Sequence, residues 1–257
     1  MRGFLPRAPF VVPGLPDRIE FTRLQLPGLL NPGSTTDIES ASNNDNLDKA
    51  QRGNQASIDT EQCLKWLDNR DPGSVVYACL GSLGRLSPGQ FIELAVGLES
   101  STHPFILVVK GGSRSEEIEK WIQDDGRIPD ALWLEFDSQG ISAGPLPMIT
   151  WPIFAEQFLN EKLLVQILGT GVGVGAQTVT HLGEYEKDEN KATRDGIKSA
   201  IERVMDKGKE GSERRKRAQE LRVMAKRSAE VEGSSYLNVT MLIQEIAQLG
   251  KTKKGIA

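Results

Sequence analysis

One pentapeptide of the chain has the spacing of a hydrolase nucleophile. Gly140–Gly144 (GISAG) matches G-x-S-x-G, in which a serine at a sharp strand-to-helix turn attacks a carbonyl carbon, and His181 lies downstream as a base. Such a turn starts a helix directly after the serine, whereas Pro145 and Pro147 follow here and block a helix. A serine hydrolase that uses Ser142 is therefore kept as an alternative hypothesis.

A glycine-rich run, Gly169–Gly175 (GTGVGVG), resembles a dinucleotide-binding loop only superficially. It matches G-x-G-x-x-G in no register, and a predicted helix precedes it instead of following it. No helix N-terminus would then face a pyrophosphate. We interpret Gly169 as the C-terminal cap of a helix that leads into a glycine-rich strand.

The remaining charged and histidine residues show no specific functional pattern. The basic segment Lys207–Arg227 is typical of a solvated helix face in a chain whose net charge is −4. His103 and His181 have no carboxylate at the spacing of a catalytic base or a metal ligand. We therefore expect no metal site and no nucleic-acid partner.

Composition limits the class of protein. The chain has 257 residues, of which 38% are hydrophobic and 26% charged, which excludes collagen-like, disulfide-scaffold and wholly disordered classes. Cys63 and Cys79 lie in apolar settings and are interpreted as buried thiols of a reducing compartment. Apolar runs such as Val75–Leu80 are too short to cross a bilayer, and Met1–Phe10 lacks a signal-peptide core. We expect a cytoplasmic protein without membrane insertion.

The composition changes near residue 60. Asn31–Asn46 contains only Ile38 and Ala41 as apolar residues, too few to offset the entropy of ordering. Residues 1–56 are predicted to form a largely extended or disordered arm, and residues 57–257 an α/β domain.

Alternating apolar runs and capped helices predict the elements of that domain. Ser74–Leu80 is a continuous apolar run, expected of a strand covered on both faces. Ser87 and Pro88 start a helix whose buried face holds Phe91, Leu94, Ala95 and Leu98, and Phe105–Lys110 is the next strand. Strand, helix and strand form a parallel βαβ unit.

The second half of the domain follows the same alternation. Further strands are predicted at Met148–Trp151 and Val172–Gly175, joined by a helix over Glu156–Leu168. Three helices complete the chain: one holding Ile197–Met205 with Gly208 as its stop, one over Gly211–Glu232 and one over Ser235–Leu249. The predicted fold class is α/β, a Rossmann-like parallel sheet with flanking helices.

One segment carries a family signal. Pro147–Gln157 (PMITWPIFAEQ) and the residues after it resemble the end of the donor-sugar box of plant UDP-dependent glycosyltransferases that act on secondary metabolites. Pro9–Gly28 resembles a segment late in the N-terminal acceptor domain of that family, and Gly53–Leu83 resembles the entry to its C-terminal donor-binding domain. The resemblance implies a GT-B fold and inverting transfer of a sugar, with UDP-glucose as expected co-substrate, to a hydroxyl of a small acceptor.

The same resemblance implies roles for particular residues. Trp151, Glu156 and Gln157 match residues that contact the donor sugar. Ser82, with Gly81 before it, matches the serine that approaches the diphosphate after the first strand, and Gln139 stands at the position of the ribose-binding glutamate. An alternative interpretation of Glu156 is a favourable charge at a helix N-terminus.

The chain departs from the family pattern where the box begins. The W-x-P-Q and H-C-G-W-N-S motifs, which hold the uracil and the diphosphate, do not occur, and Trp121–Gly140 is too short to contain that stretch. Trp133–Phe136 is a candidate to replace one of the strands that the stretch would supply. No histidine matches the family's general base, so no catalytic residue is assigned, and we expect a truncated chain with little or no transferase activity. A non-catalytic partner of intact glycosyltransferases is a further alternative.

Overall fold

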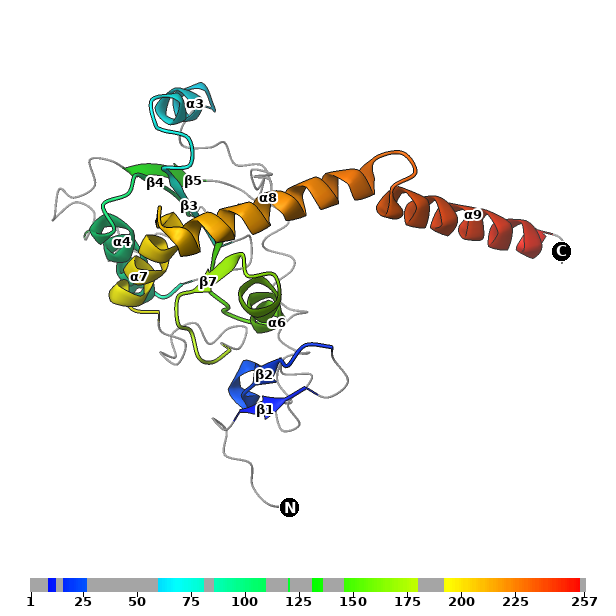
Figure 1. The fold of residues 1–257 in the computed structure, drawn as a ribbon, viewed down its shortest axis with the longest axis horizontal. Helices are drawn as coiled ribbons and strands as arrows, with labels where there is room; N and C mark the ends of the chain where they lie inside the picture. The colour runs from blue at the N-terminus through cyan, green and yellow to red at the C-terminus, as the bar shows by residue number, and fades with distance from the viewer. Residues whose placement is uncertain are drawn as a thin grey trace, which may run out of the picture.

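Two parallel sheets lie at the centre of the molecule (Figure 1). The computed structural model describes residues 9–12, 16–26, 60–80, 86–109, 120, 131–135, 146–179 and 192–254. One sheet has the order β3 (Val76–Cys79), β4 (Phe105–Val109) and β5 (Ala131–Glu135). The other pairs β6 (Met148–Thr150) with β7 (Gly171–Gly173). The sequence predicted a single parallel sheet, and over the described residues its strands form two.

The first sheet is the βαβ unit that the sequence predicts. β3 and β4 are parallel, with Val76 opposite Phe105. Between them, α4 (Pro88–Ser100) begins at Ser87, whose hydroxyl oxygen accepts a hydrogen bond from the Gln90 backbone N–H at 3.3 Å. The predicted apolar face of α4 is buried, and β5 pairs in parallel with β4. A strand predicted over Trp133–Phe136 is thus found as β5 at Ala131–Glu135 and joins this sheet, while Phe136 lies outside the described residues.

The second sheet is connected by α6 (Gln157–Lys162), which continues into a π-helical turn at Leu163–Ile167. Gly169 follows with φ +62°, a left-handed conformation that favours glycine, and the chain then enters β7. The interpretation of the glycine-rich run as a helix cap and a strand is confirmed.

A helical layer packs behind both sheets and joins them. It consists of α4 and α7 (Arg194–Met205), whose Leu98, Ile197 and Ile201 belong to one buried core together with Val172 of β7. The helices approach closely at Gly97, where a Cβ atom would lie 2.8 Å from the Ile197 Cβ atom. This layer positions the two sheets relative to each other.

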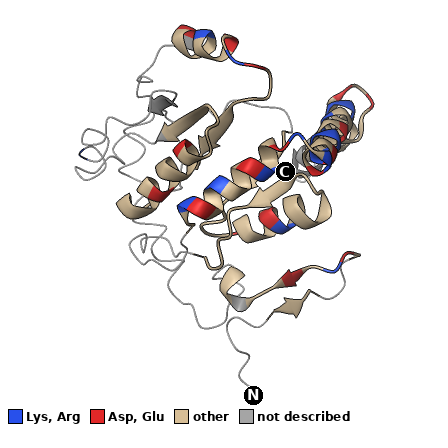
Figure 2. Ribbon diagram, turned by 60° about the vertical axis from the view of Figure 1, so that its left-hand side comes forward, with Lys and Arg blue, Asp and Glu red and all other residues tan. Residues whose placement is uncertain are grey.

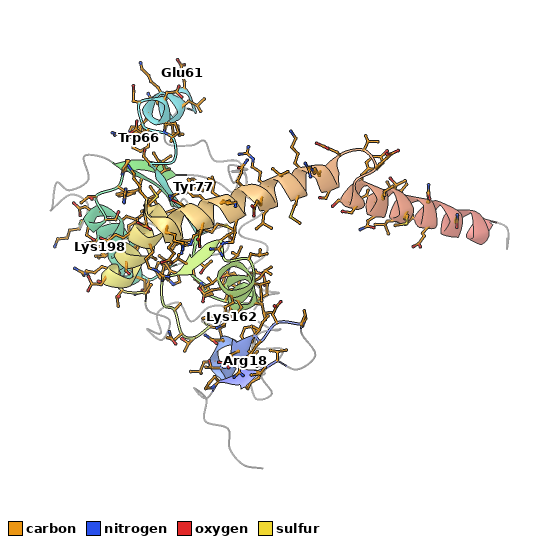
Figure 3. The ribbon with its side chains drawn as sticks, in the orientation of Figure 1. Arg18, Glu61, Trp66, Tyr77, Lys162 and Lys198 are labelled. Atoms are coloured by element: carbon orange, nitrogen blue, oxygen red, sulfur yellow. The ribbon has the colours of Figure 1, made fainter. Side chains whose placement is uncertain are left out.

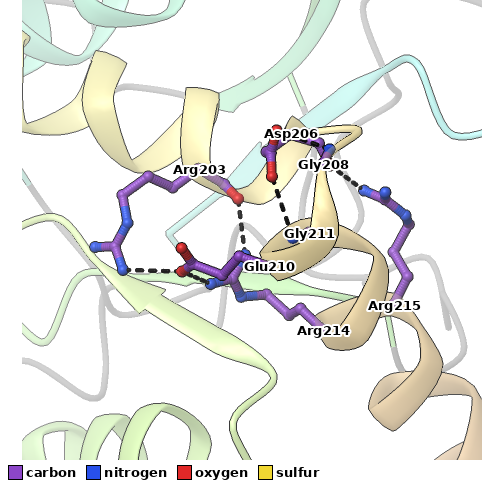
Figure 4. Close-up of polar contacts among 7 residues, drawn as sticks. All are labelled: Arg203, Asp206, Gly208, Glu210, Gly211, Arg214 and Arg215. Carbon is purple, nitrogen blue, oxygen red and sulfur yellow. Dashed lines mark hydrogen bonds and ion pairs between the residues drawn. The ribbon is translucent and has the colours of Figure 1, made fainter.

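The turn between α7 and α8 (Lys209–Ala229) is built from charged side chains (Figure 4). The Asp206 carboxylate accepts from the backbone N–H groups of Gly208 and Gly211 at 2.9 and 3.3 Å. Buried Arg214 donates to the Arg203 carbonyl at 2.7 Å and to the Glu210 carboxylate at 2.6 Å. Gly208 was predicted to stop α7, but α7 ends at Met205 with Asp206 as its C-cap, and Gly208 is the N-cap of α8. The Asp206 side chain closes the turn between the two helices.

The last two helices extend to one side of the molecule (Figure 1). Charged side chains are concentrated on the helices, whereas β3 and β4 carry none (Figure 2). α9 (Ser234–Lys254) exposes a run of large apolar side chains: Tyr236, Leu237, Val239, Met241, Leu242, Ile243 and Ile246. None of the helices in the described ranges is both long enough and apolar enough to span a membrane.

The N-terminal segment is folded against the body. β1 (Phe10–Val11) and β2 (Glu20–Phe21) form an antiparallel pair, followed by a 3-10 turn at Arg23–Gln25. Phe21 is buried in the main core, and the Lys162 ammonium of α6 lies 5.7 Å from its ring centroid. The predicted arm over residues 1–56 did not include this packing, which arises because Phe10, Ile19 and Phe21 bury apolar area on the domain.

The uncovered face of β3 differs from the prediction. A strand covered on both faces was expected, but Tyr77 is 39% exposed and Cys79 is exposed, while Val76 is buried. Alternate residues of a strand point to opposite faces. Val76 and partly buried Ala78 pack on the main core, whereas Tyr77 and Cys79 lie on the exposed face. Cys63 is a buried free thiol, as predicted. Cys79 was also predicted to be buried, and this prediction was wrong, because its free thiol is exposed.

Candidate functional site

A cavity of about 340 Å³ separates β3 from β6. Its walls come from β3, from β6 and the loop after it, and from the helices behind the sheets; the lining residues include Tyr77, Cys79, Ile149, Trp151, Gln157 and Ile201. Two of the three predicted sugar-contacting residues, Trp151 and Gln157, thus lie together at one cavity. The cavity itself is mainly apolar and offers few of the polar groups that a nucleotide sugar needs.

The loop Trp151–Gln157 is held in place by its own last residue. The Gln157 side-chain carbonyl accepts from the backbone N–H groups of Ile153 at 2.7 Å and Phe154 at 3.2 Å. Ala155 has φ +51°, an unfavourable left-handed conformation for a residue with a Cβ atom. Because the carbonyl oxygen is used inside the loop, the amide nitrogen of Gln157 is the group left to donate outward.

Glu156 stands at the N-cap position of α6 with an exposed side chain that makes no capping hydrogen bond. Its carboxylate is therefore available to accept hydrogen bonds from a ligand. The arrangement also fits the alternative interpretation, a favourable charge near the helix N-terminus.

A second glutamate of α6 was missed by the sequence analysis. Glu161 accepts a hydrogen bond from the Thr150 hydroxyl at 2.6 Å and lies against Gly173, where a Cβ atom would be 2.9 Å from its Oε2 atom. Burial raises the pKa of Glu161, opposed in part by the Thr150 hydrogen bond. The available signal was its position three residues after buried Phe158, on the same helix face.

Several predicted residues lie outside the described residues: Gly81, Ser82, Gln139, Ser142 and His181. His103 lies in the turn between α4 and β4, at the amino end of β4. Trp151, by contrast, follows the carboxyl end of its strand, β6. His103 therefore does not lie at the carboxyl end of a strand, where the predicted sugar-contacting residues are. Nothing in the described ranges brings three or more histidine, cysteine or acidic side chains together as a metal site.

Comparison with known proteins gives clear sequence relatives, although no family model matches the chain. It is 45% identical over 231 residues to anthocyanidin 3-O-glucosyltransferase 4 of Manihot esculenta, covering 79% of this chain and 95% of the relative. It is 37% identical over 315 positions to UDP-glycosyltransferase 73C6 of Arabidopsis thaliana, covering 95% of this chain and 63% of the relative. That alignment is longer than the 257 residues of the chain, so the relative has residues within it that this chain lacks.

Solved structures agree with the sequence relatives. A glycosyltransferase of Glycyrrhiza uralensis, complexed with glycyrrhetinic acid 3-O-monoglucuronide, superposes with a TM-score of 0.76 at 26% identity over 98% of this chain and 65% of that one. A second, from Phytolacca americana, complexed with UDP-2fluoro-glucose and pterostilbene, gives a TM-score of 0.54 at 30% identity over 74% and 44%. Neither the serine hydrolase nor the non-catalytic partner hypothesis finds support among these matches.

Proposed function

This chain belongs to the plant UDP-glycosyltransferase family, and we propose that it retains the donor-sugar loop of such an enzyme but transfers little or no sugar by itself. Its fold is the α/β, Rossmann-like fold of GT-B glycosyltransferases. The chain spans only 63% of the length of the Arabidopsis relative. The sugar-transfer reaction of a complete enzyme is therefore proposed for this chain's family role and is not assumed for the chain itself.

The preorganised loop after β6 is the observation that carries the sugar-binding half of the proposal. Gln157 fixes the loop because its side-chain carbonyl accepts two backbone hydrogen bonds, and its amide nitrogen is the group that can donate to a sugar hydroxyl. Glu156, the next residue along the chain, presents an exposed carboxylate that can accept from vicinal hydroxyls. Trp151, at the start of the loop, supplies an apolar surface for the sugar ring.

The remaining donor contacts are assigned by resemblance. Gly81 and Ser82 directly follow the segment that holds β3 and are proposed to approach the diphosphate, in line with ligand binding at the carboxyl ends of parallel strands. Gln139 is proposed as a weak ribose contact. The donor is a UDP-sugar, most simply UDP-glucose, and the acceptor a hydroxyl of a small plant metabolite.

The proposed loss of sugar transfer follows from family features that this sequence does not contain. Residues 57–257 are proposed to form the donor-binding domain, and residues 1–56 a remnant of the acceptor domain and linker. General-base catalysis typically contributes 10²–10⁴-fold, and no residue of this chain is assigned to it. Within the aligned region, the Arabidopsis relative has residues that this chain lacks. This supports the proposed loss of the uracil and diphosphate contacts.

Titration calorimetry of the purified chain tests both halves. We expect UDP-glucose to bind with a dissociation constant near 1 mM, about −4 kcal/mol, and more tightly than UDP. Glu156→Gln should remove the preference for UDP-glucose, whereas Glu230→Gln, an exposed glutamate at the end of α8, should not. Equal dissociation constants for UDP and UDP-glucose would contradict the proposed sugar contacts of the loop. A micromolar dissociation constant for UDP-glucose would contradict the proposed loss of the uracil and diphosphate contacts.

A transfer assay tests the activity directly. We expect no glucosylated product from UDP-glucose and a set of flavonoid, terpenoid and hormone acceptors. Product formation above that of a heat-denatured sample would overturn the impaired half of the proposal and leave the family assignment intact.

A further inference from the structure

Among the described residues, the two strands that border the cavity, β3 and β6, each pair with a neighbouring strand along one edge only. In β3, the Val76 backbone N–H donates to the Pro104 carbonyl at 2.9 Å, with Val76 opposite Phe105. In a parallel ladder, alternate residues of a strand bond to the neighbour on one side. Val76 and Ala78 therefore face β4, and the backbone groups of Tyr77 and Cys79 point to the other side.

The same argument applies to β6. Met148 donates its backbone N–H to the Thr170 carbonyl at 3.0 Å, and Thr150 accepts from the Val174 N–H at 3.0 Å. Met148 and Thr150 therefore face β7, and the backbone groups of Ile149 point away from it. Trp151, the residue directly after β6, lines the same cavity as Ile149.

These two rows face the same cavity. Tyr77, Cys79, Ile149 and Trp151 all line it, and the part of the chain that the structure describes contains no backbone partner for any of them. The indole nitrogen of Trp151 is also buried without a partner among those residues. Unpaired peptide groups beside an apolar cavity are costly, and only another peptide backbone matches two such rows. We call this region, lined by residues 77, 79, 149 and 151, the β3–β6 slot.

We propose that the β3–β6 slot binds an extended apolar segment of another polypeptide, which adds as a strand to both edges and joins the two sheets. The inference concerns association and does not depend on sugar transfer.

The undescribed residues of this sequence do not have the composition of such a segment. A strand that is inserted between two others and covered by helices is typically a continuous apolar run. Outside the described ranges, this chain has no more than two consecutive apolar residues at any point, as in Phe4-Leu5 and Leu29-Leu30. The residues outside the described ranges therefore do not supply such a run.

The walls of the slot define the chemistry of the partner. On the helical side, the cavity is lined by Leu94, Leu98, Ile197 and Ile201, so one face of the inserted strand must be apolar. On the other side, Tyr77, which is labelled on β3 in Figure 3, is 39% exposed, and Cys79 is exposed. That face of the inserted strand can therefore carry hydroxyl groups. The fitting segment alternates β-branched apolar residues with small polar ones.

A synthetic peptide tests the proposal with the full chain. The probe is Lys-Val-Thr-Val-Thr-Val-Lys, and its control has the same sequence with N-methyl groups on the three central residues, which remove the donors of a strand. We expect the probe to bind at least about tenfold more tightly than the control. In hydrogen exchange, it should slow the amides of Tyr77, Cys79, Ile149 and Trp151 at least about tenfold.

A variant locates the binding in the slot. Ile149→Pro removes an N–H that faces the slot and takes no part in pairing with β7, so it should weaken peptide binding at least about tenfold; Ile149→Val should not. Should Ile149→Pro not fold, the two peptides decide the matter in the unmodified chain. Equal binding of probe and control would show only an apolar cavity, and absence of binding or of protection would overturn the proposal. If the four amides were already protected without peptide in a dimer of this chain, the proposed partner would be wrong. The slot would then bind a second copy of the chain.

Discussion

The two sheets meet at two junctions that differ sharply. Behind the sheets, α4 and α7 pack along a fully buried surface in which Leu98 and Ile201 are each 1% exposed. The Gln90 side chain adds two hydrogen bonds to the backbone of Ala192, at 3.0 and 3.4 Å. In the plane of the sheets, β3 and β6 do not pair and a cavity of about 340 Å³ lies between them.

The difference lies in what each kind of junction requires. Helix packing needs only two apolar faces, and both α4 and α7 carry theirs in their own sequence. Sheet continuity needs a strand at one particular position, because backbone groups bond only to a neighbouring backbone. The helical junction therefore forms while the edges of the sheets stay apart.

The largest expected effect comes from weakening the packed junction. Leu98→Ala should lower the free energy of unfolding by about 2–5 kcal/mol, because it removes a buried side chain that also borders the cavity. Urea denaturation measures this. Leu159→Ala on α6, where the side chain is 38% exposed, is the control and should change stability much less. Equal losses in both variants would mean that the helical junction is not the main connection.

The same substitution should have opposite effects at the two junctions. Ala95→Val, at a 0% exposed position of α4, should cost about 1–3 kcal/mol by overpacking. Ala78→Val on β3 borders the cavity and should add about 0.5–1 kcal/mol, because it fills space and favours a strand. Thermal denaturation of the two variants measures the difference, and destabilisation of similar size in both would contradict the contrast.

Most elements of the fold could be predicted from local patterns. The Ser87 cap, the buried face of α4 and the glycine cap at Gly169 depend on residues adjacent in sequence, and all are confirmed. The separation into two sheets and the exposed face of Tyr77 could not, because pairing and coverage depend on segments distant in the chain.

The candidate site divides in the same way. Trp151, Glu156 and Gln157 fall within one short run of sequence, so the resemblance located them together, although their roles remain a prediction. That the Gln157 carbonyl holds its own loop, and that Glu161 is tied to Thr150, depends on side-chain directions that sequence spacing does not give.

Glu161 provides a pH test on the packed side of β6. Burial raises its pKa, so the fold favours the protonated carboxyl, and the stability it contributes is present at low pH and is lost as pH rises through the folded-state pKa. Glu161→Gln should therefore gain stability relative to the unmodified chain as pH increases from about 4 to 7. Urea denaturation at both pH values measures the gain. Glu156→Gln, on the exposed start of the same helix, is the control; an equal gain there would assign the effect to net charge.

The smallest expected effect is at the helical junction and has the opposite pH dependence. The Glu93 carboxylate accepts from the Arg194 side chain at 3.0 Å and from the Arg194 backbone N–H at 2.7 Å, and these contacts lower the pKa of Glu93. A lowered pKa contributes stability at neutral pH that is lost as pH falls through the folded-state pKa. Glu93→Gln should thus be less stable than the unmodified chain at pH 7, with a difference that shrinks towards pH 3 and in high salt, because the pair is exposed on the Arg194 side. A difference that grew on acidification would mean that Glu93 acts through packing, and the charged contacts between α4 and α7 would then add nothing to the apolar junction.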